Sequence, residues 1–283
     1  MIYVIAGSEE DFKEYLKNKQ LQLWDATFVN NPAQLEGLEI EEQYLHATQL
    51  GLARSDKSAL FNAPKTLTPP QQRYFMKEKY IHRSEARQST TEVKIGEECQ
   101  KEVYDLALEI FQRYGLKSVM DVGCGGALKL INRFGKLKKN NLLGMDTPET
   151  FKWLLQKYPK RMWVESPVME PVADWRIGKG DLFQGFDLMI CADVIEHLAE
   201  PDNLMAFVLV TLPEFIVLST PNRDLLQEMF ADGPPRNPAH YREWTHEEFS
   251  KYTAYWLHDE YDVVAVKPVD GSGQALVLRR LEK

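Results

Sequence analysis

The sequence predicts an α/β protein whose main part is a doubly wound, mostly parallel sheet. From about residue 98 onward, short apolar runs alternate with helical segments, and these runs are apolar throughout rather than at every second residue. Strands of that kind are buried on both faces, as in a parallel sheet that helices cover on each side. A further strand–helix–strand pattern near the N-terminus predicts a separate, small α/β module.

The N-terminal module is expected over residues 1–61. Its strands are predicted at residues 2–6 and 26–29, where apolar and β-branched residues gather. Ser8 is a suitable N-cap for a helix over residues 9–18. The sequence suggests no role for this module.

A linker with a lid-like segment is expected over residues 62–97. Three prolines lie between residues 62 and 70, where they can neither continue a helix nor sit inside a sheet. Basic residues then mix with aromatic ones over residues 71–87. This mixture predicts either a lid over an anionic or aromatic substrate or, as the commoner case, a solvated amphipathic helix.

The main domain is expected over residues 98–283. It begins with a helix over residues 98–114, whose apolar residues fall on one face and which Gly115 ends. A hairpin closes the chain, because two apolar runs flank the Asp-Gly-Ser-Gly sequence of residues 270–273. The four parallel strands between them are predicted at residues 118–122, 141–145, 186–191 and 215–219.

Composition narrows the classes of partner. The chain has 283 residues, of which 44% are hydrophobic, and 34 basic against 42 acidic residues give a net charge of −8. Such a protein has no general attraction to phosphate backbones or anionic membranes, so DNA and membranes are not expected as partners, and RNA would need a local patch. Three cysteines without paired spacing, and no secretory or membrane-spanning segment, predict a soluble protein of the cytoplasm.

The strongest local signal is a glycine turn after the first main-domain strand. Asp121 ends that strand, and Gly123, Cys124 and Gly125 follow it before a helix begins. Glycines let the backbone turn tightly and approach a ligand, and the free N–H groups of a helix start favour a negative group. A nucleotide-like cofactor is therefore expected, but NAD is not, because Leu128 stands where the dinucleotide fingerprint needs its third glycine.

Two further acidic residues are placed where they could also bind a nucleotide-like cofactor. Asp146 ends the next strand, where a carboxylate accepts hydrogen bonds from both ribose hydroxyls of a nucleotide. Asp181 precedes the fourth strand, where it is placed to accept from an adenine amine.

From about Cys99 to its end the chain resembles the class I S-adenosylmethionine-dependent methyltransferases. The resemblance is carried by the glycine turn, by Asp146, by the Gly-Asp-Leu of residues 180–182 and by the Cys-Ala-Asp-Val-Ile-Glu-His-Leu of residues 191–198. It implies a seven-stranded sheet of order 3-2-1-4-5-7-6 with an antiparallel last strand. It also implies that Asp121 and the backbone of Gly123, Cys124 and Gly125 face the methionine part of the cofactor. Asp146 would face the ribose, Asp181 and Leu182 the adenine, and Ala192 completes the implied cofactor-binding set.

A second cluster concerns the methyl acceptor. Asp193, Glu196 and His197 are spaced to share one side of a helix, and His240 follows in a proline-rich loop. They resemble the metal-binding cluster of the small-RNA 3′-terminal 2′-O-methyltransferases, and in part that of the ubiquinone-pathway O-methyltransferases. The resemblance implies a divalent metal on these four residues and catalytic roles for Asp193, His197 and His240. The alternative is a metal-free cluster that only shapes the site.

The acceptor itself stays open. Asn222 and Arg223 follow the fifth strand at the edge where ligands of such sheets gather, and are candidate substrate contacts. The first hypothesis is an enzyme that O-methylates a hydroxylated small molecule or a sugar. The alternatives are an RNA 3′-terminal 2′-O-methyltransferase and a non-catalytic cofactor-binding module.

Overall fold

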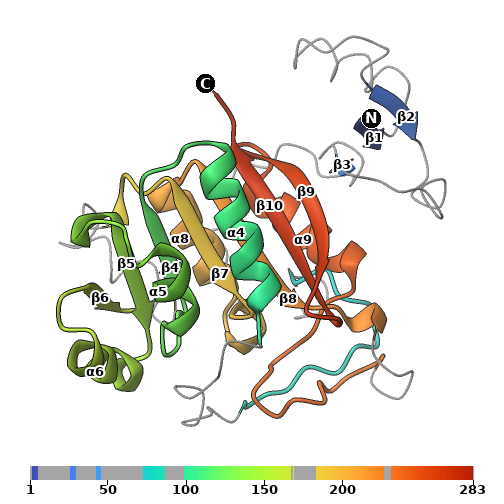
Figure 1. Cartoon of the computed structure of the whole chain (residues 1–283). Helices are drawn as coiled ribbons and strands as arrows, with labels where there is room; N and C mark the ends of the chain where they lie inside the picture. The colour runs from blue at the N-terminus through green and yellow to red at the C-terminus, as the bar shows by residue number, and fades with distance from the viewer. Residues whose placement is uncertain are drawn as a thin grey trace.

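Figure 1 shows a computed structural model of the whole chain. The structure describes residues 73–86, 99–166, 168, 183–225 and 231–282 with their side chains, and residues 2–5, 26–29 and 43–45 as strand backbone.

A seven-stranded sheet of order β6-β5-β4-β7-β8-β10-β9 forms the centre of the main domain (Figure 1). Strands β4 to β8 are parallel to one another, and β10 runs antiparallel to both β8 and β9. The predicted fold class and strand order are confirmed. The strands are β4 (Val119–Val122), β5 (Leu142–Asp146), β6 (Met162–Glu165), β7 (Leu188–Ala192), β8 (Phe215–Pro221), β9 (Tyr261–Val269) and β10 (Gly273–Arg280).

Helices cover both faces of this sheet. Figure 1 shows α4 and α5 in front of the strands and α8 and α9 behind them. The helices are α4 (Lys101–Arg113), α5 (Leu128–Phe134), α6 (Pro148–Lys157), α8 (Asp202–Thr211) and α9 (His246–Leu257), with short 3-10 turns η4 (Lys139–Asn141), η7 (Ile195–His197) and η8 (Arg223–Leu225). No helix among the described residues is long and apolar enough to cross a membrane.

The two faces have separate hydrophobic cores because side chains alternate along each strand. In β4, Val119 belongs to the core under α4 and α5, whereas Met120 and Val122 belong to the core that contains α8 and α9. All residues of β4 and β7 are buried, as the uninterrupted apolar runs predicted.

The N-terminal residues that the structure describes form a three-stranded parallel sheet of order β2-β1-β3. Strands β1 (Ile2–Ile5) and β2 (Ala26–Val29) were predicted, and β3 (Gln43–Leu45) was not. The helix predicted over residues 9–18 lies outside the described residues.

Residues 73–86, here called the strap, differ from the predicted amphipathic helix. Residues 74–86 form turns, bends and irregular backbone with no helix. The aromatic side chains of Tyr74 and Tyr80 are not on a solvated helix but are buried in the core that contains α8 and α9. Arg73 pairs with Glu200 and Asp202, so a charge that we expected in solvent is bound to the main domain.

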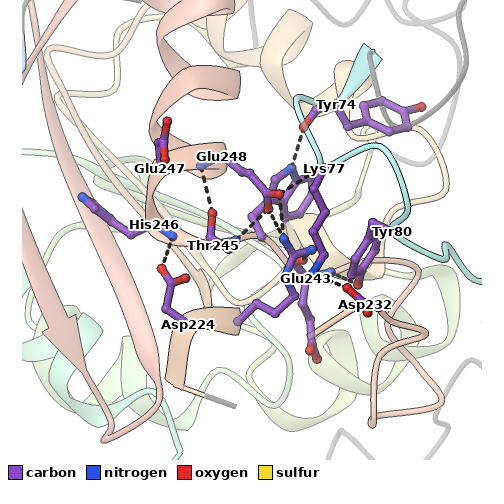
Figure 2. A network of polar contacts seen from close by, with 12 residues as sticks. Tyr74, Lys77, Tyr80, Asp224, Asp232, Glu243, Thr245, His246, Glu247 and Glu248 are labelled. Carbon is purple, nitrogen blue, oxygen red and sulfur yellow. Dashed lines mark hydrogen bonds and ion pairs between the residues drawn. The ribbon is translucent and has the colours of Figure 1, made fainter. Parts of the chain in front are cut away.

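A buried ion pair joins the strap to the end of β8 and to α9. Arg223 donates to both carboxylate oxygens of Glu248 at 2.6 Å. The Tyr80 ring lies 4.3 Å from the Arg223 guanidinium carbon, and the Lys77 backbone N–H donates to Glu248. Figure 2 shows Glu248 at the centre of this network, where it also accepts from the Thr245 backbone in the capping box that begins α9.

This network corrects the expectation that Arg223 contacts substrate. Its side chain is only 2% exposed, and its guanidinium is bound by Glu248 and by the backbone carbonyl of Glu243. A guanidinium that is buried against a carboxylate costs too much to leave unpaired, so Arg223 holds the fold together.

Replacing Arg223 with Met is expected to lower the free energy of unfolding by about 3–5 kcal/mol, because it leaves the Glu248 carboxylate buried without its partner. Urea unfolding followed by circular dichroism measures the change. Arg113→Met is the matched control, since Arg113 pairs with Glu109 at the surface and should cost less than about 1 kcal/mol. Equal unfolding midpoints for Arg223→Met and the wild type would contradict a structural role.

Candidate functional site

The predicted glycine turn lies at the carboxyl end of β4, the central strand of the parallel part of the sheet. Gly123 and Gly125 have φ angles of +76° and +53°, which favour glycine. The N–H groups of Gly123 and Cys124 donate to the carbonyl of Met145 at the end of β5. A Cβ on Gly123 would stand 2.3 Å from Val194, whereas nothing lies within 4 Å of a Cβ on Gly125. Gly123 therefore packs tightly against Val194, whereas Gly125 faces open space.

Asp121 stands directly behind this turn and is fully buried. Its Oδ2 accepts from the Tyr104 hydroxyl at 2.8 Å, whereas its Oδ1 has no hydrogen-bond partner among the described residues. Burial raises the pKa of Asp121 to about 7, against the opposing effects of the Tyr104 hydroxyl and the Lys129 ammonium. A buried carboxylate oxygen without a partner is suited to a positively charged or hydrogen-donating ligand.

Asp146 lies beside the same turn, as the sequence predicted. The backbone N–H of Gly125 donates to Asp146 Oδ2 at 2.7 Å, and that of Thr147 donates to Oδ1 at 2.8 Å. These bonds fix the carboxylate and leave each oxygen a second lone pair for a diol. The two acidic positions and the glycines therefore meet at one edge of the sheet, and these groups fit a nucleoside with an amino-acid tail.

The segment after β7 differs from the predicted helix. Asp193 has φ +52°, and only the single 3-10 turn η7 follows it. The Ser219 hydroxyl donates to the Asp193 carboxylate at 2.6 Å, and burial raises the pKa of Asp193. A left-handed residue at the strand end turns this side chain towards β8, so the helical spacing that grouped it with Glu196 and His197 does not apply.

Glu196, His197 and His240 do come together. One ligand atom from each of the three residues lies within 4.8 Å of the others, although 42 residues or more separate His240 from the first two. Asp193 is not in this group, which corrects the predicted set of four metal ligands. The two imidazole rings are perpendicular, with centroids 4.6 Å apart.

Hydrogen bonds place the proton of each histidine on Nδ1. His197 Nδ1 lies 3.0 Å from the carbonyl of Ala239, which can only accept, so the proton is on Nδ1 and the Nε2 lone pair is free. Burial and the neighbouring His240 lower the pKa of His197 to about 4, so its imidazole is neutral at pH 7.

The tautomer of His240 follows from its neighbours on both sides. Asn237 Oδ1 accepts from the Ala239 N–H, so the Asn237 NH₂ group is the one that faces His240 Nε2, at 2.9 Å. An amide NH₂ only donates, and Nε2 must therefore accept. The proton lies on Nδ1, 2.5 Å from the Glu243 carboxylate.

Glu196 completes the cluster with an oxygen. Its Oε2 accepts from the Thr220 hydroxyl at 3.1 Å. Its Oε1 lies 3.9 Å from His197 Nε2 and has no hydrogen-bond partner in the part of the chain that the structure describes. Burial and the nearby Asp193 carboxylate raise the pKa of Glu196 well above its ordinary value. Two imidazole lone pairs and a carboxylate oxygen are a suitable ligand set for a divalent transition metal.

The other residues predicted to contact substrate or cofactor are not all described by the structure. Asn222 is half-buried beyond the end of β8, where its Oδ1 accepts from the Asp224 N–H, and Ala192 is buried at the end of β7 with its carbonyl bonded to Gln100. Asp181 and Leu182 lie outside the described residues.

Sequence reasoning missed Glu243 and Tyr80. Glu243 is three residues from His240, a spacing that could have indicated a partner for the imidazole. Tyr80 had no such signal, because it meets Glu243 only in the folded chain, where its hydroxyl accepts from the Glu243 N–H at 3.0 Å.

The chain is similar to curated methyltransferases. It is 26% identical over 184 residues to a small RNA 2′-O-methyltransferase of Gallus gallus, in a match that covers 59% of this chain and 47% of that protein. It is 27% identical over 174 residues to the small RNA 2′-O-methyltransferase of Mus musculus, covering 55% and 42%. A mitochondrial ubiquinone biosynthesis O-methyltransferase of Saccharomyces cerevisiae is 27% identical over 157 residues, covering 51% and 48%. The chain thus spans about half the length of the curated relatives it matches.

The chain is also similar to a solved structure, at a lower sequence identity. The methyltransferase domain of bacterial CtHen1-C is 22% identical, with a TM-score of 0.48, over 62% of this chain and 95% of that domain. No protein-family model matches the chain. The curated relatives of this chain are methyltransferases, and its sheet has the strand order that the resemblance to the class I S-adenosylmethionine-dependent methyltransferases implied.

Proposed function

We propose that this methyltransferase acts on oxygen, holds a divalent cation with Glu196, His197 and His240, and methylates one hydroxyl of a vicinal diol at the 3′-terminal ribose of an RNA. The observation that carries the proposal is the convergence of Glu196, His197 and His240 around one point, with Glu196 Oε1 and His197 Nε2 unpartnered among the described residues. His240 Nε2 accepts from the Asn237 amide and would exchange that hydrogen bond for the cation. The relatives named for small RNA 2′-O-methylation support a ribose hydroxyl as the acceptor.

The cluster meets the requirements of a cation site. Glu196 is fully buried, and leaving one of its oxygens unpaired is costly unless a positive group compensates it. Each histidine has its Nδ1 proton bound by an oxygen, the arrangement that orients metal-ligating imidazoles. When bound there, a divalent ion would supply positive charge that lowers the pKa of an adjacent hydroxyl.

The methyl donor is proposed to bind at the glycine turn. Asp121 and the backbone of residues 123–125 would face its methionine part, and Asp146 its ribose. Asp181, Leu182 and Ala192 would lie on its adenine side. Because the sulfonium is already reactive, the main task of these residues is to align donor and acceptor.

A hydroxylated small molecule is the second candidate acceptor. The net charge of −8 opposes a general attraction to RNA, and the yeast relative is named for ubiquinone biosynthesis. A catechol or a sugar also offers two adjacent hydroxyls, so the same three ligands would serve it. Asn222 is the proposed substrate contact in either case.

Binding of S-adenosylhomocysteine is expected to weaken as the pH falls below about 7. Asp121 has a raised pKa of about 7, so it is ionised above that pH and attracts the amino-acid ammonium of the ligand, and it is neutral below. The association constant should fall by up to about tenfold per pH unit between pH 7 and 5.5, measured by calorimetry. Asp121→Asn should bind weakly at every pH; an unchanged affinity and slope in that variant would contradict the assignment.

Methyl transfer is expected to require the cation and the diol together. With a short RNA that ends in 2′,3′-hydroxyls, chelation should abolish transfer of a labelled methyl group, and Mn²⁺ should restore it. His197→Ala should reduce the rate at least about 100-fold, because it removes a ligand rather than an outer partner. His258→Ala is the matched control, since His258 caps the far end of α9.

Three results would decide between the candidates. A rate that neither chelation nor His197→Ala changes would end the metal proposal. The same RNA with a 3′-deoxy terminus should be a poor acceptor. Methylation of a catechol, with none of the RNA, would favour the small-molecule candidate.

A further inference from the structure

Glu243 is a buried acidic residue that the proposed chemistry has not used. Its side chain is 5% exposed and that of His240 is 9% exposed, with 2.5 Å between the carboxylate Oε1 and Nδ1. This contact determines which nitrogen of His240 carries the proton. It therefore keeps the lone pair on the other nitrogen, Nε2, which accepts from the Asn237 amide and would exchange that hydrogen bond for a cation in the cluster with Glu196 and His197.

Glu243 is itself fixed through its backbone on both sides. Its N–H donates to the Tyr80 hydroxyl at 3.0 Å, and its carbonyl accepts from Arg223 at 3.1 Å. Figure 2 shows Tyr80 of the strap and Glu243 beside the Glu248 network. Because Arg223 is bound by Glu248, the position of Glu243 is set by the strap, by η8 and by α9 together.

The strap also holds the loop that leads to His240. The Ile81 N–H donates to the carbonyl of Asp232 at 2.8 Å, and the Arg83 N–H donates to that of Tyr241 at 2.9 Å. The Arg83 guanidinium donates to the carbonyl of Pro235 at 2.6 Å. These bonds join two segments that are about 150 to 160 residues apart, at both ends of the loop.

We infer that Glu243, held in place by Tyr80, is a positioning residue that fixes His240 Nε2 as a ligand for the divalent cation. The inference rests on the proposed function, since it needs a cation on Glu196, His197 and His240. Glu243 touches neither cation nor substrate, and it acts by orienting and polarising the imidazole. The strap thereby becomes part of the site, although it lies before the whole methyltransferase sheet in the sequence.

The test is Mn²⁺ binding to the full chain, measured by electron paramagnetic resonance without cofactor or RNA. Glu243→Gln is expected to raise the Mn²⁺ dissociation constant about tenfold to a hundredfold, and Glu243→Ala further, because the amide still accepts the Nδ1 proton without supplying charge. Tyr80→Phe, which keeps the ring over Arg223, should raise it several-fold. Affinity for S-adenosylhomocysteine should stay within twofold in all three variants.

Glu247→Gln and Tyr114→Phe are the matched controls, because Glu247 is 75% exposed in its side chain and Tyr114 lies at the end of α4. Both should bind Mn²⁺ as the wild type does. Wild-type affinity in folded Glu243→Gln and Tyr80→Phe, whatever their unfolding temperatures, would overturn the inference and leave the proposed function standing. A wild type that binds no Mn²⁺ would overturn both.

Discussion

The buried ion pair between Arg223 and Glu248 is the interaction on which the acceptor side of this protein depends. Arg223 follows β8, and Glu248 lies in the first turn of α9, so the pair closes the connection between the parallel strands and the C-terminal part of the fold. The strap packs on the pair from a third direction. Breaking a buried pair is far more costly than forming one is favourable, and this asymmetry keeps the three segments in one arrangement.

That arrangement brings His240 to the carboxyl end of the sheet, although His240 does not follow a strand. The carboxyl ends of the parallel strands bring the glycine turn, Asp146 and Glu196 to one edge. His240 comes from a loop that belongs to no strand, and its place depends on the strap and on the segment before α9. The cofactor side is therefore built by the sheet, and the acceptor side by packing around a charged pair.

The two sides also differ in their electrostatics. At the glycine turn, Asp121 keeps one oxygen unpartnered next to a Tyr104 hydroxyl and a Lys129 ammonium, so it is poised between charged and neutral near pH 7. In the cluster, a carboxylate is buried against two imidazoles, of which His197 is neutral, and burial favours the protonated acid. At both positions one carboxylate oxygen has no hydrogen-bond donor among the described residues, and each would gain a positive partner from its proposed ligand: an ammonium at Asp121 and a metal at Glu196.

The sequence by itself indicated most strands of the sheet, though not β6, and also the glycine turn and the capping box at Thr245, because each depends on residues that are neighbours along the chain. The order of the strands was implied by the family resemblance. It also indicated Glu196, His197 and His240, but it grouped Asp193 with them by a helical spacing that the left-handed backbone at Asp193 removes. Only the tertiary structure decided that Arg223 is a structural residue, that the strap is irregular rather than helical, and that Tyr80 supports Glu243. These contacts join residues up to about 160 positions apart, and no local pattern records them, since burial and pairing arise only when the chain has folded.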